Sequence, residues 1–199
     1  MSAKKSKEPQ ADAKPQPVPV PRLFERYHQQ IVSALAEKFG RKNRLSLPRL
    51  QKIVINMGVG KAAAEKKHLE EAVEAMKTIA GQKPIVTRAR QSIAGFKLRE
   101  GQAIGCKVTL RGKRMWEFLD RLVALALPRV RDFRGLDPNG FDGHGNYTLG
   151  LTEQLVFPEL NPDKFTQTQG MNVTLVTSSD SNDEARELLR MLGMPLRAA

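Results

Sequence analysis

The chain has 199 residues, and its 33 lysines and arginines against 21 acidic residues give a formal net charge of +12. A hydrophobic content of 40% supports a domain with a core, and no apolar run is long enough to span a membrane. The single cysteine, Cys106, excludes a disulfide framework and a multi-cysteine zinc site. The N-terminus lacks the apolar stretch of a signal peptide. We therefore expect an intracellular protein with no membrane partner.

Residues 1–21 carry five prolines together with lysines and alanines. This composition predicts a disordered, basic, proline-rich arm, because it offers few apolar side chains to bury. Residues 22–199 are expected to form a single domain. Its first element is a helix over Arg22–Phe39, where apolar residues recur every three or four positions and Gly40 provides a stop.

Strands and a helix are predicted next along the chain. Short strands are expected over Lys52–Asn56 and Ile85–Arg88, and a helix over Glu65–Ala80 lies between them. The clearest strand is Gly105–Arg111, because two kinds of side chain alternate along it. Small and apolar residues (Cys106, Val108, Leu110) alternate with cationic and hydroxyl residues (Lys107, Thr109, Arg111). One face of this strand is therefore core, and the other is suited to RNA.

The C-terminal third contains a long glycine-rich loop among helices and strands. A helix is expected over Lys113–Leu127, ended by Pro128, and the loop Arg129–Asn146 follows it. Strands are expected over Tyr147–Leu151, Gln154–Phe157 and Met171–Thr177. The last helix begins with a capping box formed by Ser181 and Glu184. The loop is longer than usual connections, and we expect it to be mobile until it meets a partner. Strands and helices mix without regular βαβ alternation, which favours the α+β fold class.

Basic residues concentrate between Lys83 and Arg114, where nine lysines and arginines stand against one acid, Glu100. Such clustering favours a polyanionic partner, most often nucleic acid, since each neutralised phosphate releases condensed counterions. A solvated basic face that serves only solubility is the alternative.

The segment 89–104 combines cations with apolar side chains. Ile93, Phe96 and Leu98 are interleaved with Arg90, Lys97 and Arg99. Two interpretations are equally open: an exposed Phe96 that stacks on a base or sugar while the cations grip a backbone, or a Phe96 that plugs the core.

One motif points to another function class. Gly58–Ala63 fits the G-x-G-x-x-G/A fingerprint of dinucleotide-binding proteins, and so allows a nicotinamide-dependent enzyme as an alternative. The acid that should end the next strand is missing, because Thr87 and Arg88 stand there. The three histidines lack metal-ligand spacing, and no nucleophile–base pair is recognisable. We expect no cofactor, no metal site and no catalytic residue. A basic adaptor that binds only acidic proteins is a third possibility.

Ordered motifs along the chain resemble one known family. They are Asn56-Met-Gly-Val-Gly60, Gly81-Gln-Lys-Pro84, Ala89-Arg-Gln-Ser-Ile-Ala-Gly-Phe96, Gly105-Cys-Lys-Val-Thr-Leu-Arg-Gly112, Met115-Trp-Glu-Phe118, Pro128-Arg-Val-Arg-Asp-Phe-Arg-Gly135 and Phe141-Asp-Gly-His-Gly-Asn-Tyr147. From about Arg22 to Arg197 the chain resembles the bacterial large-subunit ribosomal protein L-five family, which binds 5S ribosomal RNA (rRNA). The arm before Arg22 is longer than expected for that family.

The resemblance implies a twisted, mainly antiparallel sheet with helices packed on one face. It also implies a structural protein of the cytoplasmic ribosome that attaches 5S rRNA in the central protuberance of the large subunit. The implied RNA partners are 5S rRNA, 23S rRNA and peptidyl-site transfer RNA (tRNA). The implied protein partners are small-subunit protein S-thirteen, with which the chain would form an intersubunit bridge, and other large-subunit proteins of the central protuberance.

The resemblance and the residue pattern together assign candidate residues to three contacts. The expected 5S rRNA-binding residues are Asn56, Gly58, Gln82, Lys83, Thr87, Arg88, Lys107, Thr109 and Arg111. The expected tRNA contacts lie in the loop Arg88–Gly101 and are Arg90, Ser92, Phe96, Lys97 and Arg99. The expected intersubunit contacts are Arg131, Arg134, Asp142 and His144.

Overall fold

The computed structural model describes residues 20–63, 65–165 and 167–197, so the predicted arm over residues 1–21 falls almost wholly outside them. Five antiparallel strands form one sheet in the order β2-β3-β1-β5-β4. Their bounds are β1 Leu50–Gly58, β2 Ile85–Arg88, β3 Ala103–Leu110, β4 Tyr147–Leu151 and β5 Met171–Thr177. The predicted α+β class is confirmed, and each strand of this sheet overlaps a predicted one.

The helices begin and end close to where the sequence predicts them. Their bounds are α1 Arg22–Arg26, α2 Val32–Phe39, α3 Lys66–Ala80, α4 Gly112–Arg121 and α5 Asn182–Met191. A π-helical turn, Tyr27–Ile31, joins α1 to α2 in one continuous helical run, and a second such turn, Leu122–Ala126, extends α4. Gly40 ends α2 in the left-handed conformation, at φ 62°.

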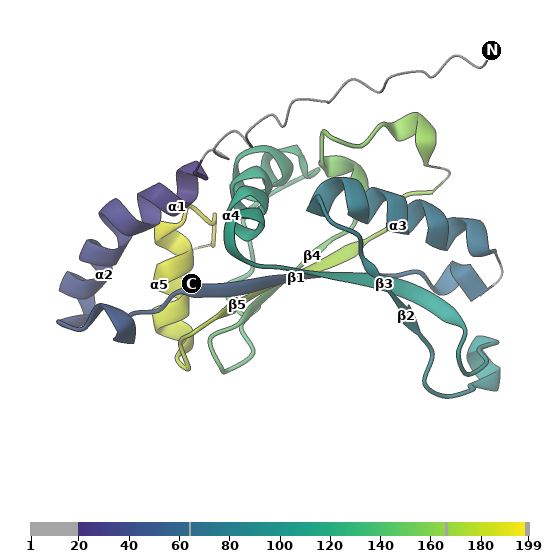
Figure 1. Ribbon diagram of the computed structural model, residues 1–199, viewed down its shortest axis with the longest axis horizontal. Helices are drawn as coiled ribbons and strands as arrows, with labels where there is room; N and C mark the ends of the chain where they lie inside the picture. The colour runs from purple at the N-terminus through teal and green to yellow at the C-terminus, as the bar shows by residue number, and fades with distance from the viewer. Residues whose placement is uncertain (1–19, 64, 166, 198–199) are drawn as a thin grey trace, which may run out of the picture.

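The helices cover one side of the sheet and leave the other side open (Figure 1). α3 and α4 lie across the covered face, while α1, α2 and α5 gather at the end where β1 begins. Ile53, Cys106 and Val173 are fully buried between the sheet and these helices. Truncation of such a side chain, for example Ile53→Ala, costs about 2–5 kcal/mol of stability. The packing therefore fixes which face of each strand is buried.

The predicted strand over Gln154–Phe157 is wrong. Gln154–Val156 forms a 3₁₀ turn, closed by a hydrogen bond from the Phe157 N–H to the Gln154 carbonyl oxygen at 3.3 Å. Val156 and Phe157 are both buried although they are consecutive, whereas successive residues of a half-buried strand point to opposite faces. The apolar residues of Gln154–Phe157 are therefore explained by their burial in the core and not by pairing with another strand.

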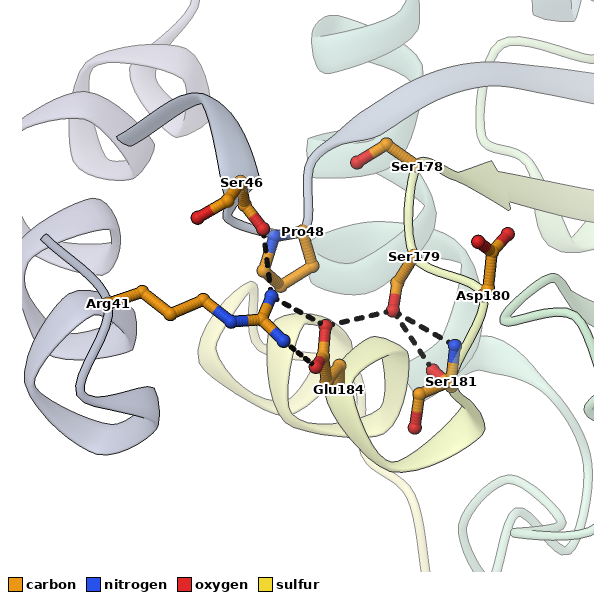
Figure 2. Close-up of a pocket in the computed structure, with 8 residues that line it drawn as sticks. All are labelled: Arg41, Ser46, Pro48, Ser178, Ser179, Asp180, Ser181 and Glu184. Atoms are coloured by element: carbon orange, nitrogen blue, oxygen red, sulfur yellow. Dashed lines mark hydrogen bonds and ion pairs between the residues drawn. The ribbon is translucent and has the colours of Figure 1, made fainter. Parts of the chain in front are cut away.

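The predicted capping box at the start of α5 is also wrong. Ser181 occupies the N-cap position but its side chain caps no backbone N–H. Figure 2 shows that the Glu184 carboxylate instead binds the Arg41 guanidinium in a two-pronged ion pair, and it also accepts a hydrogen bond from the Ser179 hydroxyl at 3.1 Å. The Ser181 N–H, which a capping box would bond to Glu184, donates instead to the Ser179 hydroxyl at 3.2 Å. The ion pair ties the segment before β1 to the start of α5.

Candidate nucleic-acid interface

The strand register places polar side chains in rows across the uncovered side of the sheet. One row crosses all five strands, because Ile85, Lys107, Asn56, Asn172 and Gly150 are successive cross-strand partners. We call this surface the open face. It consists of Lys52, Val54, Asn56, Gly58, Ile85, Thr87, Lys107, Thr109, Thr148, Gly150, Asn172 and Thr174.

The alternation predicted for the strand around Cys106 is confirmed. Cys106, Val108 and Leu110 are buried, while Lys107 is exposed and Thr109 is partly exposed. Arg111, directly after β3, is also exposed. The expected sheet residues Asn56, Thr87, Lys107 and Thr109 are thus brought together on one surface, which contains no acidic residue.

The segment before β2 is fixed by Gln82. Its amide nitrogen donates to the Thr109 carbonyl oxygen at 3.0 Å, and its amide oxygen accepts from Arg114 at 3.2 Å. These bonds hold the exposed Lys83 beside the basic end of β3. At the other end of β2, the exposed Arg88 donates to the Gly101 carbonyl oxygen at 3.4 Å.

Gly105 allows β3 to approach both neighbouring strands. A Cβ atom at this position would lie 2.7 Å from the Met57 carbonyl oxygen and 2.9 Å from the Thr87 hydroxyl. Any larger residue would therefore push β2 or β1 away and disturb the open face.

The loop between β2 and β3 is a compact hairpin that projects on the open side of the sheet (Figure 1). Ile93 and Leu98 exchange two backbone hydrogen bonds of 3.1 Å around a 3₁₀ turn, Ala94–Phe96. The Ser92 hydroxyl accepts a hydrogen bond from the Glu100 N–H at 2.9 Å. Internal bonds therefore give this loop a defined shape, and Ser92 helps to fix it.

Phe96 stands at the tip of this hairpin with 71% of its surface exposed. Ile93 beside it is 44% exposed. Arg90, Lys97 and Arg99 are exposed around them. The interpretation that Phe96 plugs the core is thus wrong, and the loop presents an aromatic ring among cations.

The long loop between α4 and β4 has a well-bonded second half. The Asp142 carboxylate accepts hydrogen bonds from the Asn146 amide at 2.7 Å and from the backbone N–H groups of His144 and Asn146. The Asn146 side chain, followed by the His144 N–H, lowers the pKa of Asp142. Asp142 therefore shapes the turn that displays the exposed His144. Arg131 and Arg134, in the first half, are also exposed.

The segment Gly58–Ala63 does not lead directly into a helix as a dinucleotide site requires. β1 ends at Gly58, and a separate 3₁₀ turn, Gly60–Ala63, precedes α3. The Gly58 carbonyl oxygen accepts a hydrogen bond from the Gln169 amide at 2.8 Å. Within the described residues there is no group of three or more histidine, cysteine or acidic side chains that could hold a metal ion, and none of the helices there could span a membrane.

Seven open-face residues were missed by the sequence reasoning, namely Lys52, Val54, Ile85, Thr148, Gly150, Asn172 and Thr174. Asn172 pairs with Asn56 across β5 and β1, and Ile85 pairs with Lys107 across β2 and β3 with 66% of its surface exposed. The alternation in Met171–Thr177 puts Asn172 on the polar side of its strand. Only the register shows that this side adjoins Asn56.

The chain is similar to known proteins over most of its length. Residues 43–99 match the family described as ribosomal protein L5, and residues 103–196 match the model for the C-terminus of the same ribosomal family. Large ribosomal subunit protein uL5 of Rhodopirellula baltica is 60% identical over 178 residues, which cover 89% of this chain and 91% of that protein. The uL5 proteins of Moorella thermoacetica and Rubrobacter xylanophilus are 60% and 57% identical over 176 residues, which cover 88% of this chain and 98% of each relative.

Proposed function

Because the chain belongs to the ribosomal protein L5 family, and is thus a non-enzymatic, RNA-binding constituent of the large ribosomal subunit, we propose that its open face binds 5S rRNA and attaches it in the central protuberance. The observation that carries this proposal is the row of Lys107, Asn56 and Asn172 on a surface that no helix covers in the described part of the chain.

The chemistry of the open face suits an RNA helix. A-form RNA presents phosphates and 2′-hydroxyls over a wide, shallow minor groove, and lysine, asparagine and threonine side chains match these groups. Lys107 supplies charge, while Asn56 and Thr109 supply neutral hydrogen-bonding groups. Lys83, Arg88 and Arg111 flank the sheet and extend the cationic surface.

The hairpin between β2 and β3 has a separate proposed partner, peptidyl-site tRNA. Phe96 offers a stacking surface, and Arg90, Lys97 and Arg99 offer charge for phosphates. Its internal hydrogen bonds hold this group in place before any partner arrives.

The long loop before β4 is proposed to contact small-subunit protein S-thirteen. Arg131, Arg134, Asp142 and His144 provide mixed charge there, which suits a protein better than a uniform polyanion. Contacts to 23S rRNA and to neighbouring proteins of the central protuberance complete the proposed set of partners.

A filter-binding titration of the purified chain with 5S rRNA at several salt concentrations tests the main proposal. If about five to seven cations meet phosphates, log affinity against log salt falls with a slope of about −4 to −6. A slope near zero, or equal affinity for an unrelated RNA of the same length, would contradict it.

A further inference from the structure

The open face is charged on one half only. Its lysines lie on β3 and at the start of β1, and the flanking Lys83, Arg88 and Arg111 border β2 and β3. The strands β5 and β4 contribute only uncharged residues, namely Thr148, Gly150, Asn172 and Thr174. The phosphates of a bound RNA are therefore expected over β2, β3 and the start of β1, and the uncharged strands β5 and β4, the neutral half of the face, are suited to another part of the RNA.

A hollow of about 310 Å³ lies in this neutral half. It is lined by Asn56 and Gly58 of β1, by Gln169 and Gly170 before β5, and by Asn172 of β5. Gly170 packs closely against the end of β4, because a Cβ atom there would lie 3.2 Å from the Leu151 carbonyl oxygen. No charged side chain lines it.

The carboxamides around the hollow are available to a ligand. Asn56 and Asn172 lie directly opposite each other and are exposed, and neither side chain has a hydrogen-bond partner among the residues that the structure describes. Gln169 donates through its amide nitrogen to the Gly58 carbonyl oxygen, which orients its amide group. Each asparagine thus presents one donor and one acceptor side by side.

We propose that this hollow binds one unstacked base of the RNA and that Asn172, together with Asn56, hydrogen-bonds to its edge. The inference rests on the proposed binding of 5S rRNA and names the part of the RNA that the neutral half takes. Bases that leave the helix stack are recognised through hydrogen bonds to their edges, and a carboxamide matches the neighbouring donor and acceptor of adenine best. Adenine is therefore the expected base. A phosphate is not, because no cation lines the hollow.

The first test compares the unaltered chain with Asn172→Leu, which keeps a similar volume and removes both hydrogen-bonding groups. The dissociation constant for 5S rRNA should rise about tenfold or more. The slope against salt should not change, since no phosphate contact is lost. The melting temperature should also stay constant because Asn172 is exposed. Asn139→Leu, in the exposed loop before β4, is the matched control and should bind like the unaltered chain.

The second test is dimethyl sulfate probing of 5S rRNA. The unaltered chain should protect an adenine that reacts in the free RNA, and Asn172→Leu should restore its reactivity while the rest of the footprint persists. Equal affinity and equal footprints for the two chains would overturn the inference and leave 5S binding standing. A loss of about one unit of salt slope would also overturn it, because the residue would then contact phosphate. Failure of the unaltered chain to bind would overturn the proposed function, and this inference with it.

Discussion

Lys107 of β3 and Asn56 of β1 lie directly opposite each other, and both side chains project from the side of the sheet that the helices leave open. The pairing joins a cation to a neutral hydrogen-bonding group at the centre of the five strands. Because the reverse side of both strands is buried, this orientation cannot change without unfolding the sheet. The open face is therefore a rigid, preformed surface.

The hairpin and the open face should be separable by mutation. Phe96→Ala with Arg99→Ala removes an exposed ring and an exposed cation, so stability and binding of isolated 5S rRNA should be retained. Translation and tRNA placement in reconstituted ribosomes should be impaired. A loss of 5S binding as large as the loss of translation would reject this division of labour.

Burial protects the single cysteine and raises the pKa of the Cys106 thiol to about 11. The folded protein should therefore resist alkylation by iodoacetamide at pH 8.5, where an unfolded cysteine is about half ionised. The raised pKa also means that the unfolded chain loses this proton first. Stability should thus fall as the pH rises from about 9 to 11, and the fall should be shallower in Cys106→Ala. Rapid labelling of the folded chain would contradict the burial.

The ion pair between Arg41 and Glu184 should contribute measurably to stability. Glu184→Ala removes both prongs of the pair and the acceptor of the Ser179 hydroxyl, and should lower the free energy of unfolding by about 1–3 kcal/mol in urea. Glu117→Ala, at an exposed position of α4, is the control and should change it by no more than about 0.5 kcal/mol. Similar losses in the two variants would mean that the pair contributes little.

Hydrogen exchange should divide the long loop into two parts. The N–H of Gly145 donates to the Asn182 side chain at 3.1 Å, and that of Asn146 donates to Asp142. Among the described residues, the N–H groups of Arg131 and Arg134 have no such acceptor. We therefore expect fast exchange near Arg131 and slower exchange near Gly145. Mobility, which the sequence predicted for the whole loop, is then expected only in its first half. Uniform protection from 129 to 146 would contradict this.

The sequence predicted elements well where one local pattern decides the structure. The alternation around Cys106 identified β3 and the correct orientation of Lys107, because a single strand has only two faces. The same alternation located Met171–Thr177, and an apolar stripe at helical spacing located the helix over Glu65–Ala80, each to within a residue at either end.

Prediction failed where distant residues decide the structure. Glu184 is bound by Arg41, which lies 143 positions earlier, so the local capping pattern could not reveal its role. The apolar run at Gln154–Phe157 has no strand partner, and its periodicity alone could not show this. Asn172 became a candidate only when the register placed it beside Asn56. Pairing between strands is a long-range property, and no spacing within one segment encodes it.

The most direct test of the open face is the salt dependence of 5S rRNA binding by a double variant, Lys107→Ala with Arg111→Ala. The control is a second double variant, Lys66→Ala with Lys77→Ala, on the exposed side of α3. If Lys107 and the flanking Arg111 both meet phosphates, the affinity of the first variant falls and its salt slope is shallower by about 1.5 to 2 units, with no change in melting temperature. The control pair should leave both quantities unchanged. Unaltered affinity and slope in the first variant would show that the RNA binds elsewhere.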